Sequence, residues 1–336
     1  MMMLKGAFVW KILLAGALCF SCSGRYDRPA LGDREFIFIR SHFTGSYYAA
    51  GAALARLVTN HTNFIGVNNT IHTLENERIR MLSGGEAQIV FLRGPEANMA
   101  YNGDPVYWDQ QQPLRAVFAL WPAVLCLVAH QESGIYKIED IKGKSIAIYS
   151  EGSVTGDLME YLLSLYGINR DNTTIYRVRD VIGINMLNLG ITDSIWYDIG
   201  YGEHRLSSHI LSGIEQFYKT GNYRLVPVEP DHRLREFLKL YPYFYLGEFG
   251  SPIGLEDAPQ LMTSSFAACS AGLPDDVVYE ISKLWWENSG FVRQFASGAI
   301  ELINTEDNRQ GVPVPFHPGA VRYLREAGLI PAPPAM

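Results

Sequence analysis

Short apolar runs and amphipathic stretches alternate along most of this chain. The first run, Glu35–Ile39, is nearly continuous and is typical of a strand buried on both faces. The stretch after it carries Leu54, Leu57 and Val58 at the spacing of one helical face. The elements predicted for this first unit are, in order, a strand at 35–39, a helix at 47–59, a strand at 63–69, a helix at 73–83 and a strand at 88–92. This β-α-β-α-β order predicts a parallel sheet with helices on both faces.

A second unit repeats the alternation further along the chain. Its predicted elements are a strand at 145–149, helices at 156–166 and 181–189, and strands at 193–197 and 224–227. The apolar segment 114–129 predicts two strands that cross between the units, and the chain is expected to return to the first unit through 241–249. A long amphipathic helix is predicted at 274–295, opened by acidic residues that suit a helix N-terminus.

Together these patterns predict an α/β fold of two lobes, each a mostly parallel sheet flanked by helices, with a hinge of two crossing segments. We assign residues 33–120 and 240–330 to lobe 1 and residues 121–239 to lobe 2. Ligands of open α/β sheets lie outside the carboxyl ends of the strands. Two lobes that face each other place those ends across one cleft, which suits hinge closure around a ligand.

The first residues have the pattern of a secretory signal. Lys5 precedes a short apolar run and Lys11 interrupts it, and the run ends in small residues and cysteines. Cys22 resembles the lipidated cysteine of a bacterial lipoprotein, so we expect residues 1–22 to be a lipoprotein-type signal peptide and residues 23–32 a tether. A plain signal peptide cleaved before Asp33 is the alternative. Either pattern predicts a periplasmic or otherwise extracytoplasmic protein, and lipidation would anchor it to the membrane.

Composition and charge argue against several classes of protein. Of the 336 residues, 48% are hydrophobic and 19% are charged, which is ordinary for a globular protein. The net charge of −7 and the lack of clustered Lys and Arg argue against a nucleic-acid partner. Cys126 and Cys269 lie among small or apolar neighbours, so we expect buried free thiols there. No Cys or His stands at ligand spacing from them, and we expect neither a metal nor a cofactor.

Four passages of the chain, taken in order, match a known family. They are Thr44–Tyr48 with Gly51–Ala55, Leu74–Asn76 with Leu82–Ala87, Ile138–Ala147 followed by Gly152 and Ser153, and Phe316–Tyr323. The set resembles the TAXI solute receptors, which are binding proteins associated with TRAP transporters, and the resemblance extends from about Phe36 to Gly328. Membership implies a periplasmic-binding-protein fold, similar to type 2, and a receptor for a small carboxylate or amino-acid-like ligand such as glutamate or a dicarboxylic acid. The implied partner is a TRAP-type membrane permease.

The chain departs from the family's pattern in the loops that a ligand would meet. The first loop, Arg40–Gly45, carries side chains where the family usually has glycines that let backbone N–H groups approach the ligand. The strand end Ile195–Asp198 carries large side chains where small residues are usual. These departures concern the loops that contact the ligand, so they leave the identity of the ligand open and bear less on the fold.

Holding a small anion requires backbone N–H groups at helix N-termini, hydroxyl groups and a guanidinium. Two polar turns directly before predicted helices supply the first two, and Arg93 follows the third strand. The candidate ligand-binding residues are Ser41, Thr44, Gly45, Ser46, Tyr48, Thr73, Asn76, Arg93, Ser150, Ser153, Thr155 and Trp196. Each has a structural alternative, which is helix capping for the hydroxyl residues, a solvated surface position for Arg93, and packing between the lobes for Trp196.

Two other functions compete with that of a transport receptor. The sequence contains no Gly-x-Ser-x-Gly elbow, Walker loop or His-Glu-x-x-His helix, so we expect no enzymatic activity. A ligand-sensing or interaction lipoprotein of the same fold, not coupled to transport, is the stronger alternative. A monomer is expected, because a transport receptor must dock on its permease.

Overall fold

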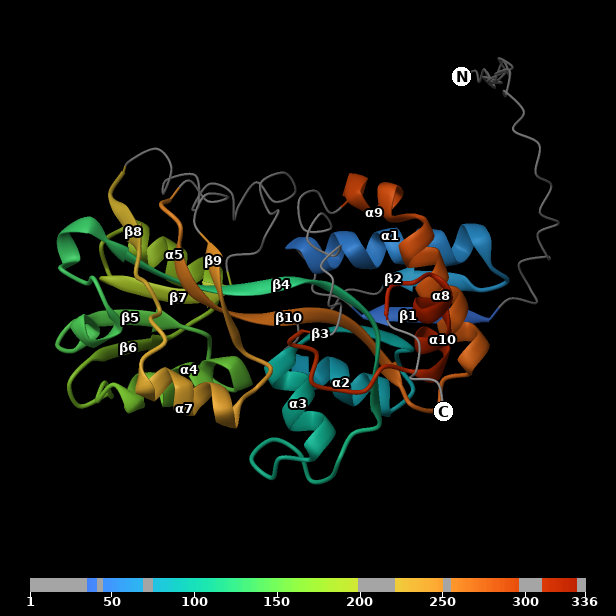
Figure 1. Ribbon diagram of the computed structural model, residues 1–336, viewed down its shortest axis with the longest axis horizontal. Helices are drawn as coiled ribbons and strands as arrows, with labels where there is room; N and C mark the ends of the chain where they lie inside the picture. Colours follow the sequence, from blue (N-terminus) through green and yellow to red (C-terminus); the bar gives the residue numbers. More distant parts are fainter. Residues whose placement is uncertain are drawn as a thin grey trace, which may run out of the picture.

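A single mixed sheet organises the protein. The computed structural model describes residues 35–40, 45–68, 75–198, 221–249, 255–295 and 310–330. Its strands are β1 (Phe36–Arg40), β2 (Ile65–Asn68), β3 (Ile89–Arg93), β4 (Leu114–His130), β5 (Ser145–Ile148), β6 (Thr174–Arg177), β7 (Ser194–Asp198), β8 (Tyr223–Leu225), β9 (Tyr245–Phe249) and β10 (Ala258–Ser270). The strand order is β2-β1-β3-β10-β4-β7-β5-β6, with β8 beside β4 and β9 beside β10. Figure 1 shows two halves joined by the long strands β4 and β10.

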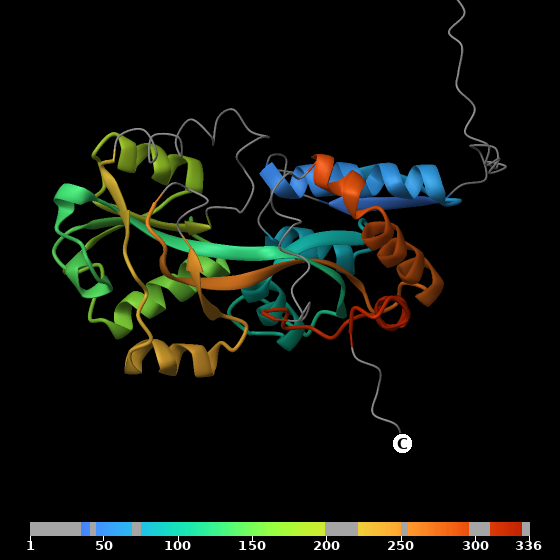
Figure 2. The ribbon, with the colours of Figure 1, turned by 45° about the horizontal axis from the view of Figure 1, so that its top comes forward.

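The first half has the predicted parallel arrangement of β1, β2 and β3. The helices that follow these strands are α1 (Gly45–His61), α2 (Glu75–Ser83) and α3 (Gly94–Asn102). Successive side chains of a strand point to opposite faces, so Ile89 and Phe91 enter one core while Val90 and Leu92 enter the other. Figure 2 shows α1 on one face of this half and α2 and α3 on the other. Helix α3 was not predicted from the sequence.

Strands β4 and β10 make the two crossings between the halves. The sequence predicted two strands at 114–129, and this prediction was wrong, because one strand runs through Pro122. Proline lacks an N–H for the ladder, and here a register shift on β10 between Ser264 and Phe266 lies opposite it. The return crossing is β10 rather than the expected segment 241–249, whose strand β9 instead pairs along the first part of β10.

The second half contains the parallel strands β5, β6 and β7, with β7 antiparallel to β4. Its helices are α4 (Val154–Leu165), α5 (Asp180–Asn188) and α7 (His232–Leu240), and two 3₁₀ turns lie at Gln131–Ser133 and Ile138–Ile141. Figures 1 and 2 show α5 on one face of this half and α4 and α7 on the other. Strand β6 and helix α7 were not predicted. The predicted α/β class is confirmed, and the residue boundaries of the two lobes stay a prediction.

Three further helices of the described residues belong to the first half. They are α8 (Asp275–Glu287), α9 (Ser289–Phe295) and α10 (Pro318–Glu326). The predicted helix at 274–295 is therefore two helices, because α8 ends at Glu287 and Asn288 caps it before α9 begins. Trp285 of α8 stacks on Phe118 of β4 with ring centres 4.3 Å apart, which fixes α8 against the sheet. His317 Nδ1 accepts the Gly319 N–H (3.2 Å) and caps α10.

The described residues carry the two cysteines expected in the folded domain. Cys126 and Cys269 are both buried, as the sequence predicted. Burial raises the pKa of Cys269 to about 12, so this thiol stays protonated. None of the described helices combines the length and the apolarity that crossing a bilayer requires. The predicted signal segment and its lipidation site, Cys22, lie outside the described residues.

Candidate functional site

The carboxyl ends of strands from both halves point toward the middle of the crossing strands. On one side β3 ends at Arg93, which pairs with Ser265 of β10. On the other side β7 ends at Asp198, which pairs with Leu125 of β4. Strands β3 and β7 run in opposite directions, so these two ends point toward each other at the junction between the halves. Open α/β sheets bind ligands outside such strand ends, which makes this junction the candidate site.

Arg93 is a buried cation at this junction. Its Nη2 lies 3.1 Å from Oε1 of Glu75, in the first turn of α2, and 3.6 Å from Oε1 of Glu96 in α3. The guanidinium lies 4.8 Å from the centre of the Tyr149 ring, in cation–π geometry. Burial disfavours the charged form, but the neighbouring carboxylates outweigh it and hold the pKa of Arg93 well above its ordinary value. The guanidinium is therefore a permanent positive charge.

Glu96 connects the two halves. Its Oε1 accepts hydrogen bonds from the Thr155 backbone N–H (3.2 Å) and from Thr155 Oγ1 (2.7 Å). Thr155 lies in the first turn of α4, so a carboxyl group of the first half occupies the N-terminus of a helix in the second. Burial raises the pKa of Glu96, against the opposing effects of Arg93 and the Thr155 hydrogen bond. A second contact between the halves is made by Tyr107, whose hydroxyl donates to Asp157 at 2.5 Å.

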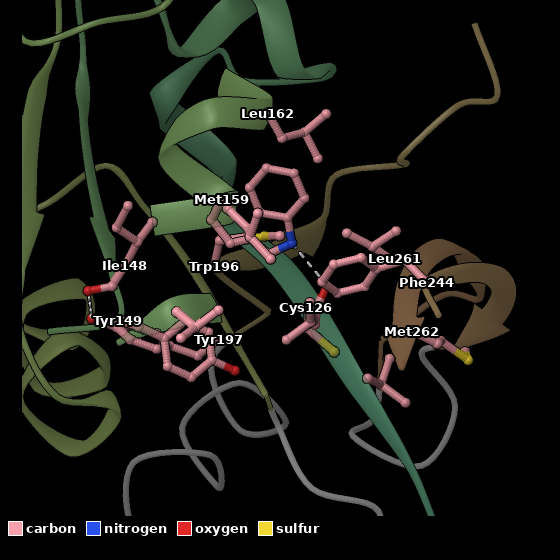
Figure 3. Packing of buried hydrophobic residues seen from close by; sticks show 14 of the residues in the cluster. Cys126, Ile148, Tyr149, Met159, Leu162, Trp196, Tyr197, Phe244, Leu261 and Met262 are labelled. Atoms are coloured by element: carbon pink, nitrogen blue, oxygen red, sulfur yellow. Dashed lines mark hydrogen bonds between the residues drawn. The ribbon is translucent and has the colours of Figure 1, made fainter. Parts of the chain in front are cut away.

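Asp198 and Tyr149 complete the junction from the second half. The backbone N–H of Asp198 donates to the hydroxyl oxygen of Tyr149 at 2.5 Å. The rings of Tyr149 and Tyr197 meet edge to face with centres 5.3 Å apart, and Figure 3 shows them side by side. Burial raises the pKa of Asp198 from 3.8 to about 7, although Arg93 acts against this. The Asp198 carboxyl group therefore changes charge near neutral pH.

Four buried polar atoms, three at the junction and one on Asn76 beside Glu75 in α2, have no hydrogen-bond partner among the residues that the structure describes. They are Asn76 Oδ1, Arg93 Nε, Glu96 Oε2 and Asp198 Oδ1. Leaving such a group unpaired costs about 1–3 kcal/mol, and folded proteins contain few of them. We use the name junction cluster for Glu75, Asn76, Arg93, Glu96, Tyr149, Thr155 and Asp198.

A family model for the NMT1-like family matches residues 41–328, which is most of the chain. The chain belongs to the NMT1-like family. Several solved structures are also similar to it at low identity. XAC2383 from Xanthomonas citri bound to ATP is 10% identical, with 88% of this chain and 97% of that chain covered and a TM-score of 0.50. The periplasmic aliphatic sulphonate binding protein SsuA from Escherichia coli is 12% identical, with 81% and 82% covered and a TM-score of 0.45. At this level of identity the likeness concerns the fold alone.

Several residues predicted from the sequence of this NMT1-like protein lie outside the described residues. They are Ser41, Thr44, Thr73 and the side chain of Ser46. Gly45 is the first residue of α1, and Tyr48 on the same helix is 47% exposed. Its neighbour Tyr47 turns inward instead, and its hydroxyl donates to Ser265 Oγ at 2.9 Å. Tyr47 is thus the tyrosine that reaches β10, and it does so at Ser265, the residue that pairs with Arg93.

Three of the predicted residues, Asn76, Arg93 and Thr155, fall in the junction cluster and are buried. Two others lie on the turn that leads into α4. Ser153 caps this helix, since its hydroxyl accepts the Gly156 N–H at 3.4 Å, which is the structural alternative noted above. The carbonyl of Ser150 accepts from Arg177 Nη2 at 3.1 Å.

Trp196 lies in the core of the second half. It is fully buried, and its Nε1 donates to the Leu125 carbonyl at 2.9 Å. Figure 3 shows the indole packed beside Met159 and Leu162 of α4. Trp196 therefore has a packing role, which was the structural alternative to ligand contact, and its indole N–H is satisfied by the backbone of a crossing strand.

Sequence reasoning missed Glu75, Glu96, Tyr149 and Asp198. Two of them had a signal in the sequence, because Asp198 and Tyr149 directly end or follow apolar strand segments, where ligand-facing groups of α/β folds are found. Glu75 and Glu96 lie in helices and reach the junction only through tertiary packing. Among the described residues, no group of three or more His, Cys, Asp or Glu side chains is placed to hold a metal ion.

Proposed function

We propose that this protein is an extracytoplasmic solute-binding receptor that captures a small carboxylate at the junction between its two halves. It performs no covalent chemistry and hands the solute to a TRAP-type permease, as in the TAXI receptors that its sequence motifs resemble. A lipid on Cys22, left after removal of the signal segment 1–22, would hold a monomer at the membrane. The observation that carries the proposal is the meeting of two opposed strand ends at a buried cation, Arg93, beside the N-terminus of α4.

Several groups are available to a carboxylate at this position. Arg93 offers its Nε–H, which is buried and lacks a partner among the described residues. Charge-assisted hydrogen bonds from a guanidinium are the strongest that a protein offers a carboxylate. The proposed contacts are Arg93 and Asn76 from the junction cluster together with Ser41, Thr44, Gly45, Ser46, Tyr48, Thr73, Ser150 and Thr155. Membership of the NMT1-like family supports this proposal.

The test is the melting temperature of the purified protein against a panel of carboxylates, amino acids, sugars and neutral amides. A ligand at about 100 times its dissociation constant stabilises the folded state by about 2.7 kcal/mol, which raises the melting temperature by a few degrees. We expect a rise for a subset of the carboxylates. The same rise should vanish in Arg93→Gln and persist in Arg322→Gln, an exposed arginine of α10, each measured against its own ligand-free baseline. A flat response of the native protein to all carboxylates would refute the carboxylate assignment.

A further inference from the structure

A single oxygen of Glu96 contacts two residues that the proposed function assigns to the ligand. Glu96 Oε1 accepts hydrogen bonds from the Thr155 backbone N–H (3.2 Å) and from Thr155 Oγ1 (2.7 Å), and it lies 3.6 Å from Arg93 Nη2. A helix N-terminus, a hydroxyl and a guanidinium are the groups that bind a small carboxylate. The Glu96 side chain therefore occupies the position from which a ligand carboxylate would contact Arg93 and Thr155 together.

The Thr155 N–H depends on the other half of the molecule for its acceptor. The first N–H groups of a helix have no partner within that helix. In α4 the Gly156 N–H donates to Oγ of the cap residue Ser153 at 3.4 Å, and the helical ladder begins with the bond from Asp157 N–H to the Ser153 carbonyl at 3.0 Å. The Thr155 N–H between them donates to Glu96 of α3. This hydrogen bond therefore reports whether Glu96 is seated at the N-terminus of α4.

Exchange of Glu96 for the ligand fits the charges of the junction better than addition of the ligand beside it. Arg93 already faces the carboxyl group of Glu75 at 3.1 Å and that of Glu96 at 3.6 Å. A further carboxylate would add a negative charge to this buried place and bring no cation with it, which is unfavourable. A ligand carboxylate that replaces Glu96 leaves the total charge unchanged.

The hold of Glu96 on this position is incomplete. Glu96 is 2% exposed, and its Oε2 is buried without a hydrogen-bond partner among the residues that the structure describes. A carboxylate oxygen in that state has given up its bonds to water and gained none in return. A ligand carboxylate that pairs both of its oxygens can therefore displace Glu96, whose own carboxylate then returns to water.

We infer that Glu96 is a built-in competitor of the ligand, which it excludes from Arg93 and from the N-terminus of α4. This inference rests on the proposed receptor function and adds a regulating contact to the same site. Because Glu96 belongs to α3 and Thr155 to α4, the contact also joins the two halves, and its displacement frees them at this point. The receptor thus binds its ligand less tightly than its site would without Glu96.

The first test is isothermal titration of the native protein, Glu96→Ala and Glu77→Gln with each carboxylate of the melting panel, glutamate, glutarate and succinate among them. For at least one acid we expect Glu96→Ala to bind more tightly than the native protein by about tenfold to a hundredfold, the size of a charge-assisted hydrogen bond. Glu77→Gln is the matched control, because Glu77 is exposed on α2, and it should bind as the native protein does. Glu96→Gln keeps an oxygen for Thr155 but no charge, so its gain should be smaller than that of alanine.

Thermal unfolding of each variant establishes that it is folded at the titration temperature, and Glu96→Gln serves in place of Glu96→Ala if the alanine variant is unfolded. Equal or weaker binding by the folded Glu96 variants would overturn the inference while leaving the receptor function intact. Absence of binding by the native protein and by every variant would overturn the carboxylate receptor itself, and the inference with it.

The second test is hydrogen exchange at single-residue resolution in buffer without carboxylates. In Glu96→Ala the Thr155 amide should exchange faster by about tenfold or more, because it loses its acceptor, whereas the Gly156 amide keeps Ser153 Oγ. Glu77→Gln should change neither rate. A Thr155 amide that exchanges equally fast in the native protein and in Glu96→Ala would overturn the contact on which the competition rests.

Discussion

At the scale of single residues, the main feature of the junction is the guanidinium of Arg93 and the groups that contact it. Arg93 has carboxyl groups of Glu75 and Glu96 beside it, and Tyr149 lies under its planar face. The sequence predicted Arg93 directly after the third strand, and in the structure it is the last residue of β3, because an apolar run that ends in a charged residue marks a strand end. Nothing local indicated Glu96, since its partner Thr155 is 59 residues away and belongs to the other half.

The clearest prediction at the scale of single residues is that Asp198 makes the stability of the protein depend on pH. The groups that act on it are Arg93, which lowers its pKa, and Asp180, Glu75 and Glu96, which raise it together with burial. A carboxyl group whose pKa is raised to about 7 in the folded protein binds its proton more tightly than in the unfolded chain. Its contribution to stability is therefore present at low pH and is lost as the pH rises from about 4 toward 7.

Asp198→Asn should remove this dependence. From pH 5 to pH 8 we expect the free energy of unfolding of the native protein to fall by about 2–3 kcal/mol relative to that of the variant. The reason is that the neutral amide resembles the protonated acid at every pH. The measurement is urea unfolding of both proteins at several pH values. Asp171→Asn, an exposed loop residue of the second half, controls for the loss of one carboxylate. A difference between native protein and Asp198→Asn that does not change with pH would contradict the raised pKa of Asp198.

At the scale of elements, most of the first half was predictable because its apolar periodicities are strong. The apolar periodicity failed to predict elements in which buried positions hold polar side chains that hydrogen-bond to distant residues. Strand β10 went unnoticed because Thr263, Ser264 and Ser265 interrupt its apolar run, although all three are buried in the fold. Thr263 Oγ1 donates to the Tyr243 carbonyl, and Ser265 Oγ accepts from Tyr47. Hydrogen bonds to distant partners thus keep polar residues inside a central strand, which no local pattern can show.

Helix α4 provides the prediction at this scale, through the close contact at its first turn. A Cβ added at Gly156 would lie 2.5 Å from Arg177 Nη2 and 2.9 Å from the Tyr149 carbonyl oxygen, and the carbonyl cannot move freely. We expect Gly156→Ala to lower the free energy of unfolding by about 1–3 kcal/mol, as overpacking does in other cores. Gly290→Ala in α9 is the matched control, because nothing lies within 4 Å of its added Cβ.

The measurement is the free energy of unfolding of the two alanine variants and of the native protein, by thermal or urea unfolding. The control should be as stable as the native protein or gain up to about 1 kcal/mol, since alanine favours helices over glycine. Equal stability of both variants would mean that the first turn of α4 is not held against Tyr149 as described. Loss of stability in the control alone would contradict the packing of both helices.

At the scale of the whole molecule, the two halves share one sheet and are linked by the two long strands β4 and β10. The remaining contacts between them include the hydrogen bonds from Thr155 to Glu96 and from Tyr107 to Asp157. Two lobes joined by a pair of crossing strands are the arrangement in which hinge motion opens and closes a site. The sequence anticipated two lobes and two crossings, but the second crossing strand was assigned to the wrong segment.

The central claim is that a solute binds at the junction and contacts both halves, and hydrogen–deuterium exchange tests it most directly. Peptides covering 75–78, 93–97, 153–157 and 195–198 should gain protection together when the best solute of the melting panel is added at saturation. Protection in both halves is expected because the junction cluster draws its residues from α2, β3 and α3 on one side and from α4 and β7 on the other. Peptides around Asp171, which lines a surface pocket at the far end of the second half, serve as the internal control and should not change. Protection confined to one half, or centred on Asp171, would contradict the account.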